Sequence, residues 1–79
     1  MEQLRNIGPV SAGRLAAVGI KSIADLEEIG SVAAYRRVKE SFPADTSLNL
    51  LYALEGALLD LPWDGLPVGV KEELRTAAG

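Results

Sequence analysis

The side chains that most often carry out catalysis are missing from this 79-residue sequence. It has neither histidine, the commonest general base, nor cysteine, the best thiol nucleophile. Its Asp and Glu residues show no metal-ligand spacing, and no Walker loop or dinucleotide-binding fingerprint is present. The serines at 11, 22, 31 and 47 stand where turn or helix-cap residues are expected. We therefore expect no catalytic residue, no metal site, no cofactor and no small-molecule substrate.

The segment Asn6-Ile7-Gly8-Pro9 has the clearest binding chemistry. It separates a short helical turn from a second helix, which predicts a helix-hairpin-helix-like unit over about residues 2–29. Such hairpins commonly read Gly-hydrophobic-Gly, and Asn6 is a coherent replacement because Asn tolerates left-handed backbone better than most residues. The hairpin amides and the N-terminus of the following helix would point at one DNA phosphate. The candidate contacts are Arg5, Gly8, Val10, Ser11, Arg14 and Lys21.

The hairpin also has a structural interpretation, in which it only packs two helices together. We favour this interpretation because position 10 is Val10, where DNA-binding hairpins often place a basic residue. The formal net charge of −3 also argues against a dedicated nucleic-acid binder, which usually carries a basic face.

Glu55 is a second residue that the sequence singles out. On a helical projection of residues 48–61 it lies among leucines, and a buried charge must be paired or neutralised. One interpretation is a functional acid or an anion that binds a partner. We favour a structural ion pair with Arg36 or Arg37, or a hydrogen bond to the Tyr35 hydroxyl, because ion-pair networks also produce unusual carboxylates.

Glycine, proline and cap residues divide the chain into short helices. We expect a helical turn at 2–6 and helices at about 9–18, 23–29, 31–42, 48–61 and 68–78. The start signals are Pro9, Ser22, Ser31, and Thr46 or Ser47, and Gly19 and Gly30 are stop signals. No strand pattern is present. The result is one all-α domain, residues 1–79, built as a compact bundle of five to six short helices.

The apolar spacing predicts which side chains share the core. The helix at 48–61 has so wide an apolar arc that it should be central, with neighbours on more than one side. The core residues we expect are Ile7, Leu15, Ile20, Leu26, Val38, Leu51, Leu54 and Leu58.

Composition sets the class of protein. The 48% of apolar residues excludes a disordered tail, and no apolar stretch is long enough to span a bilayer. The first residues lack a cationic region followed by an apolar run, so no signal peptide is expected and the predicted location is the cytoplasm.

The whole chain from Leu4 onward resembles a known family. The residues that carry the resemblance are Asn6-Ile-Gly-Pro9, Val18-Gly-Ile20 with Ala24-Asp-Leu26, Ala33-Ala-Tyr-Arg36, and Ser47-Leu-Asn-Leu-Leu51 running into Ala53-Leu-Glu-Gly-Ala-Leu58. They are similar to the C-terminal domain of the TfoX/Sxy regulators of bacterial competence. The resemblance implies a helix-hairpin-helix-like domain in a protein that promotes expression of DNA-uptake genes. It implies no catalytic or ligand residues.

Two classes of function follow. The first is a regulatory module that acts through contacts with a protein partner or with itself, which an acidic chain with surplus leucines and Trp63 favours. The alternative is weak, sequence-independent DNA binding through the hairpin, with help from the basic residues Arg36, Arg37 and Lys39. A run of three basic residues on a helix is usually a solvated face, so it gives DNA binding little support.

Overall fold

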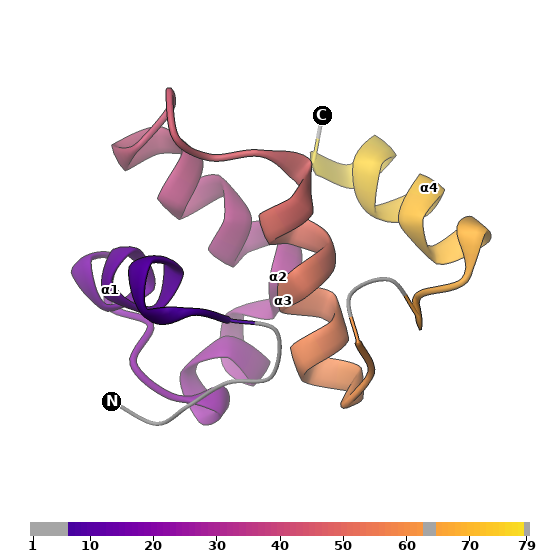
Figure 1. The fold of residues 1–79 in the computed structure, drawn as a ribbon, viewed down its shortest axis with the longest axis horizontal. Helices are drawn as coiled ribbons and strands as arrows, with labels where there is room; N and C mark the ends of the chain where they lie inside the picture. Colours follow the sequence, from indigo (N-terminus) through magenta and orange to yellow (C-terminus); the bar gives the residue numbers. More distant parts are fainter. Residues whose placement is uncertain (1–6, 63–64, 79) are drawn as a thin grey trace.

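The computed structural model describes residues 7–62 and 65–78, and these residues form four α-helices and no strand. The helices are α1 (Pro9–Ala17), α2 (Ile23–Ser41), α3 (Leu48–Leu59) and α4 (Val68–Ala78) (Figure 1). The all-α class is therefore as expected. The turn predicted at 2–6, Trp63 and Asn6, the first residue of the predicted hairpin, lie outside the described residues, so the expected helix-hairpin-helix-like unit is not confirmed.

The start and end of α1 follow from its sequence. Gly8 is the N-cap in extended conformation, and Pro9 occupies the first helical position, where a missing N–H costs nothing. Gly19, with φ of 90°, follows the C-cap Val18, and the Ile20 amide donates to the Leu15 carbonyl at 2.9 Å. This is the left-handed end that the glycine predicted.

Helix α2 combines two of the predicted helices. The Ser22 hydroxyl accepts a hydrogen bond from the Asp25 amide at 3.2 Å, which is the expected cap. The Asp25 carboxylate accepts from the Lys21 amide at 2.9 Å, one residue before the position that a capping box would use. Gly30 is non-helical, with φ of 84° and ψ of 162°, yet the chain resumes its helix at once. The predicted stop at Gly30 is therefore present as a kink between two helical segments. The expected count of five to six helices is not confirmed, because α2 runs across this kink as one element and the turn at 2–6 lies outside the described residues.

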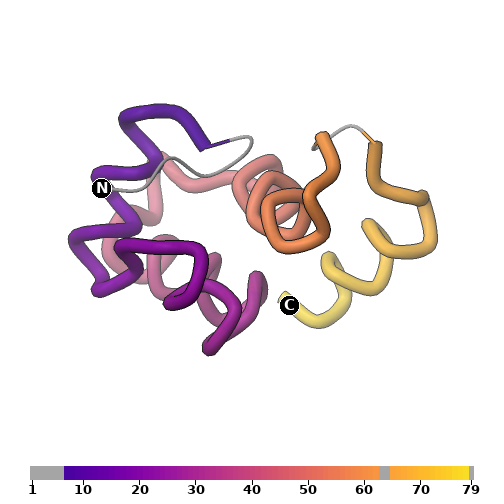
Figure 2. Tube along the Cα trace, turned by 90° about the horizontal axis from the view of Figure 1, so that it is seen from below, coloured from indigo at the N-terminus to yellow at the C-terminus, as the bar shows by residue number. Residues whose placement is uncertain are grey.

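Helix α3 lies between the other elements. It packs against α2 along its length and also contacts α4, whereas α1 lies on the far side of the molecule from α4 (Figures 1 and 2). The expected central position of this helix is confirmed. It ends at Leu59 and not at 61, because Asp60 is left-handed and the Leu61 amide turns back to the Gly56 carbonyl at 2.8 Å.

The core is supplied mainly by α2 and α3. Each of these helices buries five residues, whereas α1 and α4 each bury one, Leu15 and Leu74. The predicted core residues are buried except Leu58, which is half-buried at its margin. Helix α4 is also tied to its neighbours by Arg36, which donates to the Ala77 carbonyl, and by Lys71, whose ammonium lies 5.5 Å from the centre of the Tyr52 ring. Among the described residues, no helix is both long and apolar enough to cross a membrane.

Candidate functional site

The described part of the predicted phosphate site is the first turn of α1. Gly8 is exposed and has an extended backbone, with φ of −80° and ψ of 174°. The backbone at this position is not left-handed, so its conformation does not require a glycine. Val10 is 66% exposed, and it places an apolar side chain where a basic side chain would favour phosphate binding. Arg5 and Asn6 fall outside the described residues. The first turn thus offers exposed backbone but no charge of its own.

The other two basic candidates are not gathered at this turn. Lys21 is exposed, but it follows the C-terminal end of α1, at the opposite end of the helix from Gly8. Arg14 is directed to the loop between α2 and α3. Its Nη1 donates to the Asp45 carbonyl at 3.1 Å, its Nη2 lies 3.9 Å from Asp45 Oδ2, and its guanidinium is 5.6 Å from the centre of the Phe42 ring.

Two basic residues of α2 also donate to backbone carbonyls of the chain itself. Lys39 Nζ donates to the carbonyls of Pro43 at 3.1 Å and Thr46 at 2.9 Å, and so holds the turn that follows α2. Arg36 donates to Ala77 in the last turn of α4, where a cation also interacts favourably with the helix dipole. These contacts give Arg36 and Lys39 roles in the fold.

Glu55 pairs with a hydroxyl group from the helical segment at 31–42, as expected, but the partner is Ser31 and not Arg36, Arg37 or Tyr35. Its Oε1 accepts a hydrogen bond from the Ser31 hydroxyl at 2.8 Å, while Arg36 reaches α4. Ser31 is 5% exposed and follows the break at Gly30, and the Glu55 side chain is half-buried. The contact joins α2 to α3 through a neutral donor, so it is a hydrogen bond and not the expected ion pair with arginine.

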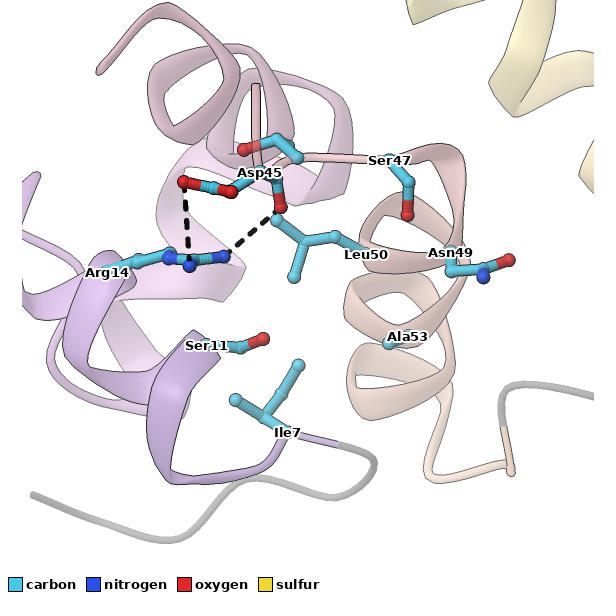
Figure 3. A pocket seen from close by; sticks show the side chains of 9 residues that line it. Ile7, Ser11, Arg14, Asp45, Ser47, Asn49, Leu50 and Ala53 are labelled. Carbon is cyan, nitrogen blue, oxygen red and sulfur yellow. Dashed lines mark hydrogen bonds and ion pairs between the residues drawn. The ribbon is translucent and has the colours of Figure 1, made fainter. Parts of the chain in front are cut away.

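A pocket of about 280 Å³ lies between α1 and the start of α3 (Figure 3). Ile7, just before α1, and Leu50 and Ala53, on α3, are the apolar residues that line it. The polar residues that line it are Ser11, Arg14, Asp45, Thr46, Ser47 and Asn49. Two predicted phosphate contacts, Ser11 and Arg14, therefore belong to this pocket and not to an open hairpin surface. Sequence reasoning missed it, because the pocket depends on how α1 faces α3 and no local pattern encodes that.

The described residues hold no group of three Asp, Glu, His or Cys side chains able to bind a metal ion. Within the same residues, every fully buried side-chain polar atom has a hydrogen-bond partner. The polar groups with capacity for a ligand are therefore at the surface and in the pocket.

Two solved structures are similar to the chain over most of their length. One is the tetragonal crystal form of a protein of unknown function from Listeria monocytogenes, with 36% identity, a TM-score of 0.89, and coverage of 98% of this chain and 94% of that one. The other is the triclinic crystal form of an uncharacterized protein from Listeria monocytogenes, with 38% identity, a TM-score of 0.86, and coverage of 92% and 82%. Neither description states an activity. No curated protein sequence matches the chain.

A family model assigns the chain to a protein family, which the descriptions of the two solved structures do not name. The model of the TfoX C-terminal domain matches residues 1–78, which is almost the whole chain and includes the Asn6–Pro9 segment, the Gly30 break and α3. The resemblance that the sequence motifs indicated is therefore confirmed, and the chain belongs to the TfoX C-terminal domain family.

Proposed function

We propose that this domain is a non-catalytic regulatory module of the kind used by regulators of DNA-uptake competence, and that it acts in the cytoplasm through protein–protein contacts. The observation that carries the proposal concerns two of the three basic residues on α2 that were expected to help DNA binding. Arg36 and Lys39 donate to backbone carbonyls of the same chain, whereas nucleic-acid binding depends on cations that meet phosphates.

The exposed side chains support the same conclusion. Val10, Leu59 and Val68 are 66%, 49% and 72% exposed, so apolar surface remains on three of the helices. The net charge of −3 gives no general attraction for a polyanion. A partner protein or a second copy of the chain would gain from covering such side chains, whereas a DNA backbone would not.

DNA binding through the start of α1 is the second candidate. It is favoured by the exposure of Gly8 and by a first turn whose amides have no N-cap side chain to which they can donate, because the N-cap is this glycine. Contacts of this kind reach phosphates and carry little base specificity. They would give a dissociation constant of about 10⁻⁴–10⁻⁶ M that weakens as salt rises.

A titration with duplex DNA distinguishes the two candidates. Backbone amide chemical shifts would be followed at about 50 mM and about 200 mM salt, a range over which phosphate contacts lose most of their affinity. We expect no salt-dependent shifts at Gly8, Val10 or Ser11. Sedimentation of the free protein at increasing concentration tests self-association in parallel. Salt-sensitive DNA binding that Gly8→Val abolishes, with the amide spectrum of the fold retained, would contradict the protein-contact proposal.

A further inference from the structure

The pocket between α1 and α3 is lined by both apolar and polar side chains. Its apolar residues are Ile7 and Ala53, which are 7% and 8% exposed, and the half-buried Leu50. The Ser11 hydroxyl, which lies beside Ile7, points toward α3 (Figure 3). A volume of about 280 Å³ is at the small end of ligand sites, which suits a single amino-acid residue better than a cofactor.

Arg14 supplies the positive charge of the pocket. Its side chain is 29% exposed and is held in place by the Asp45 carbonyl and the Phe42 ring. A guanidinium has five N–H donors, and the 3.9 Å separation from the Asp45 carboxylate is too long for a hydrogen bond. Most donors of this pre-positioned group are therefore available to an anion, and a carboxylate matches their geometry.

Asp45 has the only carboxylate among the described residues that line the pocket, so it is the negative charge there that would oppose a bound anion. Its side chain is 63% exposed and largely hydrated, which weakens its effect on a nearby anion. The pocket's cation, Arg14, is the less exposed of the two charges, and apolar side chains line the same pocket. The arrangement is complementary to a carboxylate that is attached to an aliphatic group.

We propose that this pocket binds the C-terminal residue of a partner protein, with the terminal carboxylate on Arg14 and an aliphatic side chain against Ile7, Leu50 and Ala53. This proposal rests on the proposed function, because it names the chemistry by which one protein contact would be made. The Ser11 hydroxyl adds a hydrogen bond to the bound carboxylate.

The test uses N-acetyl-L-leucine as the probe and N-acetyl-L-leucinamide, which lacks the carboxylate, as its matched control. Amide chemical shifts of Ser11, Leu50 and Ala53 are followed during each titration of the full chain. We expect saturable shifts with the acid and none that saturate with the amide. Equal responses to both compounds, or no saturable response to the acid, overturn the proposal.

Charge variants make the test sharper. Arg14→Gln should weaken binding at least about tenfold, the loss of a charge-assisted hydrogen bond, while Arg75→Gln on exposed α4 surface removes the same charge without effect. Asp45→Asn removes a negative charge from the lining and should strengthen binding of the acid severalfold. Because this substitution changes only an exposed turn residue, it tests the proposal even where Arg14→Gln does not fold. Weaker binding by Asp45→Asn would show that the Asp45 carboxylate supports binding instead of opposing a bound anion, and would overturn the proposal. Failure here leaves the DNA titration unaffected, so the two proposals fail separately.

Discussion

The Ser31–Glu55 hydrogen bond joins α2 to α3 and also gives the half-buried Glu55 carboxylate a hydrogen-bond partner. A serine directly after a helix break is expected to cap the next helical segment, but this hydroxyl donates across to α3. It supplies Glu55 with a partner at 2.8 Å without placing a second charge in the interface. Because the carboxylate is half-buried, water completes its solvation and no buried ion pair is required.

Removing the Ser31 hydroxyl should therefore cost less than breaking a buried salt bridge. We expect Ser31→Ala to lower the free energy of unfolding by about 1–3 kcal/mol, toward the lower end because the Glu55 carboxylate keeps contact with water. Denaturant unfolding followed by circular dichroism measures the change. The matched control is Ser41→Ala at the exposed end of α2, which should stay within about 0.5 kcal/mol of the parent. Equal effects of the two substitutions would show that the hydrogen bond adds no stability.

At the scale of elements, the break within α2 repeats a pattern from the start of α1. Ile7-Gly8-Pro9-Val10 and Ile29-Gly30-Ser31-Val32 share an Ile-Gly-x-Val sequence, and in each case a helical segment begins just after the glycine. The two glycines differ in conformation, since Gly8 is extended and Gly30 has positive φ. The second break lets α2 bend while it remains packed on α3.

The positive φ of Gly30 gives a testable contrast with a glycine inside a helix. A Cβ at Gly30 would meet no atom within 4 Å, so Gly30→Ala should cost only its backbone strain, about 1–3 kcal/mol. Gly13, within α1, also has open space around it and no positive φ. Gly13→Ala should stabilise the protein by up to about 1 kcal/mol. Thermal unfolding of both variants checks the opposite signs, and a stabilising Gly30→Ala would contradict the assigned conformation.

At the scale of the whole molecule, stability is concentrated in the α2–α3 pair. These two helices bury five residues each, and the fully buried Leu26, Leu51 and Leu54 all belong to them. Helix α4 contributes only Leu74 to the core, and its remaining ties are at the surface. Local stability follows the number of buried apolar contacts, so the peripheral helices should open before the central pair.

Native-state hydrogen exchange measures this difference directly. Amides of α3 and of the second half of α2 should exchange most slowly, near the rate set by global unfolding, while those of α1 and α4 exchange through local opening at lower free energy. Leu74→Ala should accelerate exchange in α4 and leave α3 much less affected. Uniform protection across all four helices would show instead that the chain opens only as a single unit.

The sequence by itself determined the helices, most of their ends, the core and the family. Helix periodicity, Pro9, Ser22 and Gly19 act through neighbours within a few residues, so they can be interpreted before any packing is known. Tertiary structure alone decided the partners of charged side chains. Glu55 bonds to Ser31 across 24 positions and Arg14 to Asp45 across 31, and these contacts depend on how the helices cross. The expectation that Glu55 pairs with the 31–42 segment is confirmed, but Ser31 is the partner in place of Arg36, Arg37 or Tyr35, because a helical projection gives the face on which a side chain lies and not the residue opposite to it.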